Sequence, residues 1–352
     1  LRAIEAGAEE RGWFDLGTLY ATGPTEIRDP SNAADAYGRA VELGNPWAMI
    51  ELAAMLGNGN GVAADFPRAE ALLRQAISLG GESAQSALLL LGDLYRGPGK
   101  NPVKAAAAYQ GAVDLGSGPA MLKMAAMLRA GEGVTANFGA AQALLRQAID
   151  AGQDRWGWAA LGALAADPNN PDRNMNEAAA AYAKAAELGE PWSMVTLGEM
   201  LSSGADMAPD YARAIALLSE AGALGGDSAK SAYATLGGVY RNSPAPFQDF
   251  AKAADAYAKA ADLGDTPSML TLARMYRLGE GVPADHEAAR KYLELAIQGG
   301  AALQGWAELG LIYSDPNSPI ADTAKAAAAY QSASDLGDIW STIALARLVG
   351  LG

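Results

Sequence analysis

The chain has 352 residues, with 26 basic and 40 acidic side chains, a formal net charge of −14 and no cysteine. The lack of cysteine excludes disulfides, thiolate metal sites and cysteine nucleophiles, and the negative charge argues against nucleic-acid or anionic-membrane partners. The best apolar run, from Ala87 to Leu91, is far below the roughly 20 residues of a membrane span, so direct membrane insertion is not expected.

A glycine recurs at the end of helix-like segments along the whole chain. Leucine precedes most of these glycines, as at Leu43 and Leu336. Glycine just past a helix end adopts the left-handed conformation that a Cβ would penalise. The series, with intervals of 35 to 39 residues, predicts ten helix ends at Gly7, Gly44, Gly80, Gly116, Gly152, Gly189, Gly225, Gly264, Gly299 and Gly337.

A second series of small residues marks a first helix in each repeat, and this small residue is called position 0. Apolar residues usually stand at positions −1 and +3, as in LGTLY at 16–20 and LARMY at 272–276. Positions −4, −1, 0 and +3 fall within about 100° of one another on a helical wheel, which predicts a buried stripe that a neighbouring helix approaches closely. Position 0 is Gly17, Ala53, Gly92, Ala125, Gly162, Gly198, Gly237, Ala273, Gly310 and Ala346.

A second helix follows in each repeat, and in alternate repeats it reads Ala-x3-Tyr-x2-Ala. The turn between the two helices alternates between Pro-rich and Gly-rich types, so the full period is a pair of hairpins, about 73 residues. One hairpin cannot bury its apolar stripe alone, but a stack of hairpins buries a continuous one, which predicts an all-α solenoid. The Ala-x3-Tyr-x2-Ala segments are 33–40, 105–112, 178–185, 253–260 and 326–333.

The repeats carry a family resemblance. Segments 13–20 and 306–313 both read Trp-x2-Leu-Gly-x2-Tyr, which resembles tetratricopeptide repeats, and the Gly-x-Gly-Val insertion with the longer repeat resembles the Sel1-like subclass. The resemblance implies a right-handed α-solenoid of tandem helical hairpins. We expect a single solenoid of about nine to ten repeats over residues 1–352, with partial repeats at both ends, in a fragment of a longer chain.

Three features that could indicate chemistry have simpler structural interpretations. The Gly-rich turns at 59–62, 131–134 and 279–282 follow a helix and lack the lysine of a phosphate loop. The single histidine, His286, is interpreted as a partly exposed packing residue, and it cannot form a two-histidine zinc site or a full set of triad partners alone. The Asp-Asn-Pro stretch at 167–172 suits a turn, with calcium binding as the alternative. We expect no cofactor, no metal and no enzymatic activity.

The candidate binding residues lie at positions −6, +1 and +4 of the first helices, which share one side of the helical wheel. The resemblance implies that this side lines a concave groove. Exposed Trp and Arg anchor many interfaces, and aligned arginines suit an acidic segment or another anion. Two alternatives stay open: the tryptophans pack on the preceding loop, or the arginines pair with carboxylates of adjacent repeats. The residues are Trp47, Trp156, Trp192 and Trp340 at −6, Arg96, Arg129, Arg241 and Arg277 at +4, and Arg274 and Arg347 at +1.

The leading hypothesis for function is a non-catalytic scaffold or adaptor that binds a protein or peptide partner. The bacterial-envelope context of Sel1-like proteins implies a periplasmic or otherwise extracytoplasmic location in a bacterium, with the cytoplasm as the alternative. Two other functions stay open: binding of an anionic polysaccharide by groove Trp and Arg residues, and a spacer within a larger protein. The end hairpins lack polar caps, which predicts end-to-end association.

Overall fold

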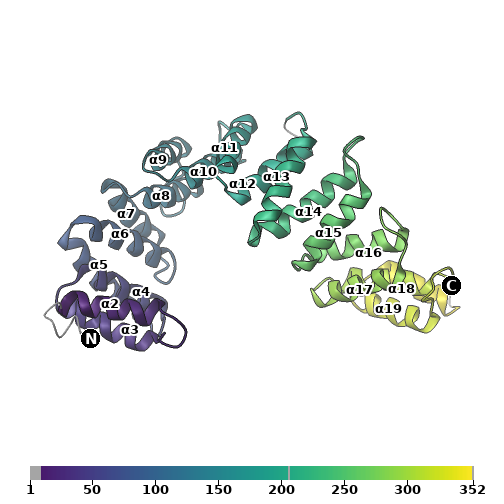
Figure 1. Cartoon of the computed structure of the whole chain (residues 1–352), viewed down its shortest axis with the longest axis horizontal. Helices are drawn as coiled ribbons and strands as arrows, with labels where there is room; N and C mark the ends of the chain where they lie inside the picture. Colours follow the sequence, from purple (N-terminus) through teal and green to yellow (C-terminus); the bar gives the residue numbers. More distant parts are fainter. Residues whose placement is uncertain (1–8, 205–206, 351–352) are drawn as a thin grey trace. The chain divides into compact units, whose positions relative to one another are not determined.

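The computed structural model describes residues 9–204 and 207–350 (Figure 1). The chain divides into two compact units, Leu1–Asn174 and Met175–Gly352. In these described ranges every regular element is an α-helix, and there are 19 helices. The boundary falls inside the fifth predicted hairpin. The expectation of one solenoid over 1–352 concerns how the units join, and it stays a prediction. The predicted helix end at Gly7 lies outside the described residues.

Unit 1 contains four helical hairpins followed by one further first helix. In each hairpin the first helix packs against the second, and the second packs against the first helix of the next hairpin. The helices are α2 (Glu9–Thr22), α3 (Pro30–Glu42), α4 (Pro46–Asn58), α5 (Phe66–Leu79), α6 (Gly81–Arg96), α7 (Pro102–Asp114), α8 (Gly118–Ala130), α9 (Phe138–Asp150) and α10 (Asp154–Ala166).

Unit 2 begins with a second helix, continues with four hairpins and ends with a first helix. The same order of packing holds along it. The helices are α11 (Met175–Glu187), α12 (Pro191–Ser203), α13 (Tyr211–Leu224), α14 (Asp227–Asn242), α15 (Phe250–Asp262), α16 (Thr266–Leu278), α17 (His286–Gln298), α18 (Ala302–Ser314), α19 (Thr323–Asp335) and α20 (Ile339–Leu348).

Short polar residues start most of these helices. Asn45 accepts a hydrogen bond from the Ala48 amide at 2.8 Å, and Asp65 accepts one from the Arg68 amide at 3.0 Å. Such side chains satisfy backbone donors that have no partner inside the helix. Proline follows the cap in several first helices, where its missing N–H costs nothing; Pro46 is an example. None of the described helices has the length and apolar character needed to cross a bilayer.

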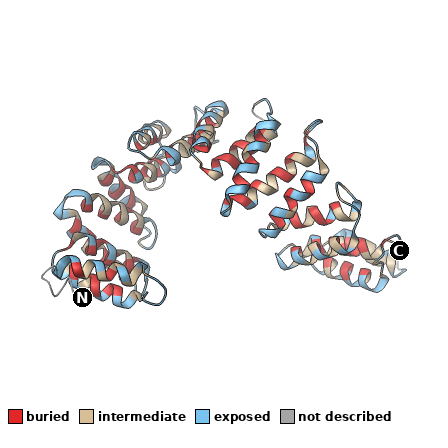
Figure 2. Cartoon of the chain, in the orientation of Figure 1, coloured by how far each residue is buried: buried red, intermediate tan, exposed pale blue. Residues whose placement is uncertain are grey.

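The predicted stripe of the first helices is buried within each unit. In α4, Met49, Leu52, Ala53 and Leu56 are all at most 4% exposed. Figure 2 shows the same pattern along both units, with buried residues on the faces turned toward neighbouring helices and exposed residues at the turns. The prediction of an all-α repeat fold with a continuous stripe of packed helix faces is therefore confirmed inside each unit.

Within each unit, in the repeats whose second helix contains the Ala-x3-Tyr-x2-Ala segment, the Tyr packs against the small residue at position 0. A Cβ added to Gly17 would lie 2.6 Å from the Tyr37 ring, and one added to Gly237 would lie 2.8 Å from the Tyr257 ring. The flanking alanines of the Ala-x3-Tyr-x2-Ala segments are fully buried, as Ala33 is. In these repeats the predicted close approach is therefore a contact between an aromatic ring and a glycine.

The glycine series is confirmed with one correction. The predicted left-handed glycine Gly299 has φ −77° and is an ordinary helix end, whereas the next residue, Gly300, has φ +99°. The extra glycine lets the chain place its left-handed residue one position later, after one more helical residue. The other described members have positive φ: Gly44, Gly80, Gly116, Gly152, Gly189, Gly225, Gly264 and Gly337.

The Gly-rich turns connect the two helices of a hairpin and also contact the preceding hairpin. The second glycine of each turn lies against the first residue of the second helix in the preceding hairpin: Gly61 against Pro30, Gly133 against Pro102, and Gly281 against Phe250. The contacted atoms include backbone, so no side chain fits there. These turns are docking elements between repeats, in agreement with their interpretation as architecture.

Candidate binding face on the first helices

The candidate face consists of the exposed side of the first helices, and each unit presents its own part of it. The four tryptophans at position −6 are exposed there: Trp47 by 40%, Trp156 and Trp192 by 49%, and Trp340 by 78%. Each stands in the first turn of its helix. The guanidinium of Arg155 lies 4.7 Å from the Trp156 ring centroid, and one face of that ring thus meets a cation. Large aromatic surface is available on this face.

The tryptophans at position −4 behave differently. Trp13 and Trp306 pack against hydrophobic clusters of their units and are only partly accessible. Two positions along a helix rotate a side chain by about 200°, so −6 and −4 point to opposite sides. The separation of exposed and packed tryptophans follows the predicted wheel.

Five of the six predicted arginines are paired with carboxylates of the next repeat. This outcome agrees with the alternative that the sequence left open, and it changes what the arginines offer to a partner. The pairs are Arg96 with Glu132, Arg129 with Asp167, Arg241 with Glu280, and both Arg274 and Arg277 with Glu308. For the sixth, Arg347, no ion pair is found among the residues that the structure describes, and the residue is exposed.

The glutamates of two Gly-rich turns receive the strongest of these pairs. Arg96 donates to Glu132 through Nε at 3.0 Å and through Nη2 at 2.8 Å. Arg241 donates to Glu280 in the same way at 3.2 and 2.9 Å. The hydrogen bonds to these glutamates raise the pKa of both arginines. The Gly-Glu-Gly-Val turn therefore holds the end of the preceding first helix with a two-point ion pair.

Neighbouring first helices also meet through position +1 of one helix and position −2 of the next. Asp93 and Lys123 form such a pair at 2.8 Å, and Thr235 donates to Glu199 at 3.1 Å. In unit 2, Arg274 at +1 donates to Glu308 at −2 at 3.0 Å, and Arg277 at +4 adds its Nη2 at 3.4 Å. At these three interfaces position −2 is thus the polar partner of position +1 on the preceding first helix.

One interface in unit 1 has a carboxylate at −2 without such a partner, and it contains a cleft. Between α2 and α4 the structure has a cleft of about 260 Å³, lined by residues that include Ala21, Glu51, Asn58 and Asn60. Glu51 stands at −2, but no ion pair is found for it in the described residues, and burial by the surrounding protein raises its pKa. The sequence analysis did not single out Glu51, although its register matches that of Glu308.

A similar cleft occurs in unit 2, between α12 and α14. It measures about 300 Å³, and its lining includes Ser202, Thr235, Gly238 and Asn242. These residues stand at +4 of one first helix and −2, +1 and +5 of the next, in the register of the cleft in unit 1. Both clefts have a small side chain at +4, where the first helices α6, α8, α14 and α16 each place an arginine. This cleft is neutral, because Thr235 replaces the glutamate.

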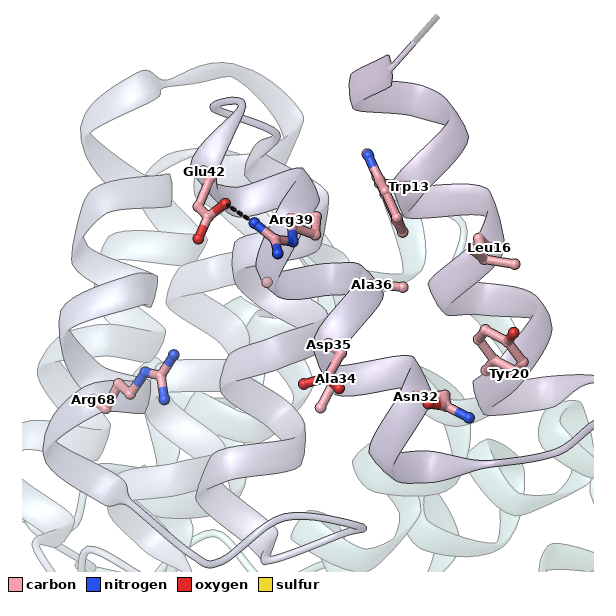
Figure 3. Close-up of a pocket in the computed structure, with 11 residues that line it drawn as sticks. Trp13, Leu16, Tyr20, Asn32, Ala34, Asp35, Ala36, Arg39, Glu42 and Arg68 are labelled. Carbon is pink, nitrogen blue, oxygen red and sulfur yellow. Dashed lines mark hydrogen bonds and ion pairs between the residues drawn. The ribbon is translucent and has the colours of Figure 1, made fainter. Parts of the chain in front are cut away.

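A further cavity lies at the N-terminal end of the described chain. It measures about 650 Å³ and lies between α2, which contributes Trp13, Leu16 and Tyr20, and α3 (Figure 3). Its charged residues are exposed, and Arg39 pairs with Glu42 at 3.2 Å. The cavity brings together no buried titratable groups, so its geometry offers no catalytic arrangement.

The remaining candidates for chemistry are engaged in packing and turns. The ring nitrogens of His286 lie 2.8 Å from Ser318 Oγ and 3.3 Å from the Arg277 carbonyl oxygen, as expected for a packing residue. Asp167 accepts a hydrogen bond from the Asn169 amide at 2.9 Å and also pairs with Arg129. In the part of the chain that the structure describes, no group of three or more His, Asp or Glu side chains could hold a metal ion.

The repeating hairpins and their exposed first-helix face define an α-helical repeat protein. The Sel1 repeat family matches five segments, residues 48–81, 118–153, 193–226, 231–265 and 266–300. The chain is a member of the Sel1 repeat family, in agreement with the resemblance seen in the sequence. A search of curated protein sequences gave no match.

Three solved structures share the fold at 24% identity or less. The chain is similar to a Sel1 repeat protein from Oxalobacter formigenes, with a TM-score of 0.60 and 24% identity over 86% of this chain and 87% of that one. It is similar to yeast Tom70, with a TM-score of 0.50 and 14% identity over 88% and 66% of the two chains. A signal-transduction ATPase with a tetratricopeptide repeat sensor from Pyrococcus horikoshii gives 0.50 and 16% over 96% and 52%.

Proposed function

We propose that this chain is a non-catalytic scaffold that binds a protein or peptide partner on the exposed face of its first helices. Sel1 and tetratricopeptide-like repeats generally mediate protein–protein interaction. The observation that carries the proposal is the row of position −6 tryptophans, since Trp47, Trp156 and Trp192 are 40 to 49% exposed on helices whose opposite stripe is buried. Exposed tryptophans of this kind are frequent hot spots of interfaces.

The state of the arginines favours a protein partner over an anionic polysaccharide. A polyanion would need cationic groups that are not already neutralised. Five of the six candidate arginines pair with carboxylates of their own chain, so competition for them would cost the contacts between repeats. The position −6 tryptophans take no part in these ion pairs, so a partner can contact them without breaking the pairs.

The context of the partner follows from the family resemblance alone. We propose an adaptor role in a bacterial envelope assembly, with the chain in the periplasm or another extracytoplasmic compartment. Fractionation of the native cells with an antibody to the chain tests the location, and recovery only with the cytoplasmic fraction would contradict it.

The test of the binding proposal is capture of partners from a native envelope extract by immobilised protein. Trp47→Ala and Trp192→Ala are compared with Trp47→Phe and Trp192→Phe, which keep an aromatic ring, and with Val103→Ala on a second helix, where an apolar side chain is 64% exposed. We expect a partner that the alanine variants lose and the other three variants retain. Equal capture by all five variants, with unchanged circular dichroism, would exclude the tryptophan face as the binding site.

A further inference from the structure

The two glutamates at position −2 of first helices stand in different surroundings. Glu308 on α18 is 16% exposed at its side chain and receives Arg274 and Arg277 from α16. Glu51 on α4 faces α2, where the same positions +1 and +4 are Thr18 and Ala21. Neither can supply a positive charge. The chain therefore contains an occupied guanidinium site in unit 2 and the same site without guanidinium in unit 1.

The space beside Glu51 is open. The replacement of an arginine by Ala21 at position +4 leaves the cleft of about 260 Å³, with Glu51, Asn58 and Asn60 around it. Asn60 stands at the place in the Gly-rich turn where Glu132 and Glu280 bind arginines in other repeats. The cleft thus offers one carboxylate and two amide side chains, and its walls include Ala54 and Met55.

Polar side chains that line the cleft with Glu51 are engaged with other groups. Tyr37 lines the same cleft, but its hydroxyl donates to Thr18 Oγ1 at 3.3 Å. Asn58 uses its amide group to donate to the Ala54 carbonyl at 3.0 Å. The Glu51 carboxylate therefore lines the cleft, and among the residues that the structure describes no side chain donates a hydrogen bond to it.

Trp47 is exposed on α4, one helical turn before Glu51, and is not itself part of the cleft lining. Trp47 and Glu51 are four residues apart on one helix, so their side chains are neighbours on the same face. An arginine can place its guanidinium on a carboxylate through two parallel hydrogen bonds and can also stack on an indole ring. A lysine has neither the planar fork nor the same stacking geometry.

We propose that the cleft between α2 and α4 binds an arginine side chain of the partner, with Glu51 as the counter-ion and Trp47 as the adjoining aromatic surface. This inference rests on the proposed function, and it specifies a basic segment as the partner of unit 1. The chain charge of −14 also favours the approach of such a segment. The methylenes of the arginine contact Ala21, Ala54 and Met55, and Glu51 then plays the part that Glu308 plays within unit 2.

The probe is a fluorescein-labelled peptide, Gly-Arg-Gly-Arg-Gly, whose binding is followed by fluorescence anisotropy at moderate ionic strength. The same peptide with citrulline in place of arginine keeps the shape and removes the charge. We expect saturable binding of the arginine peptide, weakened at least about tenfold by citrulline and by Glu51→Gln, because a charge-assisted bidentate pair is lost. Glu220→Gln, on the exposed surface of the second helix α13, is the matched control and should bind as wild type does.

A second variant tests the internal comparison directly. Ala21→Arg places an arginine where Arg277 stands in unit 2, so it should occupy the cleft from inside and weaken the peptide at least about tenfold while the helical circular dichroism is retained. The proposal is wrong if wild type fails to bind the arginine peptide, or if Glu51→Gln and Ala21→Arg bind it as well as Glu220→Gln does.

The same variants separate this inference from the proposed function. In the capture experiment, loss of the partner with Trp47→Ala, Glu51→Gln and Ala21→Arg supports both. If Trp47→Ala loses the partner and both cleft variants retain it, the scaffold function stands and the arginine site is wrong. If none of the tryptophan variants loses it, the proposed function fails independently of the peptide result.

Discussion

The α16/α18 interface of unit 2 and the α2/α4 interface of unit 1 carry different side chains at the same repeat positions. In the first, Arg274 and Arg277 neutralise Glu308 and join consecutive hairpins. In the second, small neutral residues leave Glu51 without a cation and open a cleft. A repeat fold makes this comparison direct, because the backbone register is shared and only the side chains differ. A filled position stabilises the stack, and an unfilled one is free to bind.

The same comparison revises the interpretation of the arginines on the first helices. Aligned arginines on a helix face suggest an anion site when only the sequence is considered. In the structure, most of these arginines form ion pairs with carboxylates of the next repeat. The unpaired charge that the first-helix face offers between α2 and α4 is negative, which changes the expected partner of unit 1 from an acidic segment to a basic one.

The largest expected effect is at the filled position. Glu308→Ala removes the shared partner of two arginines, and Arg277 is only 25% exposed with a buried Nε that lacks a hydrogen bond in the described structure. We expect a loss of about 2 kcal/mol in the free energy of unfolding, measured by urea titration, because partly buried charges are left unpaired. Glu51→Ala is the matched variant and should change stability by less than about 0.5 kcal/mol. Equal losses in the two variants would contradict the comparison.

A somewhat smaller effect is expected at the Gly-rich turn. Arg241→Ala breaks the two-point pair with Glu280, in which the arginine side chain is 26% exposed and the glutamate side chain 23%. The substitution should cost about 1 to 1.5 kcal/mol of unfolding free energy. Arg39→Ala breaks a highly exposed pair with Glu42 and should cost less than about 0.5 kcal/mol. Capture of the partner by Arg241→Ala should equal that of wild type if the arginine serves the stack alone.

The open position should accept a built-in cation. Ala21→Arg is expected to raise the free energy of unfolding by about 0.5 kcal/mol through a new pair with Glu51, since exposed pairs rarely contribute more. A double-mutant cycle with Glu51→Gln measures this coupling. A coupling energy of zero would show that position +4 of α2 cannot reach Glu51, and the comparison with Arg277 would lose its basis.

The smallest effect concerns pH. Because burial raises the pKa of Glu51, the folded chain retains this proton more strongly than the unfolded chain does. The contribution of Glu51 to stability is therefore present below its ordinary pKa and falls as the pH rises through the raised value. Tyr37, with its own pKa raised, stays protonated over this range.

We therefore expect Glu51→Gln to gain stability relative to wild type as the pH rises from below the ordinary pKa of glutamate toward neutrality, by less than about 0.5 kcal/mol because the Glu51 side chain is only partly buried and is screened by solvent. Thermal unfolding at several pH values measures the gain, with Glu220→Gln as the control. A gain of the same size in both variants would assign the effect to net charge and not to the cleft.

Much of the fold follows from short-range patterns in the sequence. Position 0 and the Ala-x3-Tyr-x2-Ala segments specify which faces are buried, because a helix repeats its faces every 3.6 residues. Tyr37 against Gly17 is the outcome of that pattern. Gly299 shows how precisely the pattern places a helix end. Gly299 and Gly300 both suit a helix end, and the sequence pattern selected the wrong one of the two.

The candidate site was predicted less completely. The exposure of Trp192 follows from its place on the helical wheel, and the wheel needs no knowledge of neighbouring repeats. The pairing of Arg96 with Glu132 spans 36 residues and that of Arg241 with Glu280 spans 39. A spacing close to one repeat was the available indication of these pairs, since residues about one repeat apart lie in adjacent hairpins.

The sequence by itself determined the repeat, the helical hairpin and the side of each first helix that meets the core, because these depend on local geometry and on the periodicity of apolar residues. Only the tertiary structure decided which charges on the outer side neutralise one another. That outcome depends on the offset between consecutive first helices, which brings position +1 opposite position −2, as for Arg274 and Glu308. It also depends on the side chain at +4, which closes the space beside Glu308 and leaves it open beside Glu51.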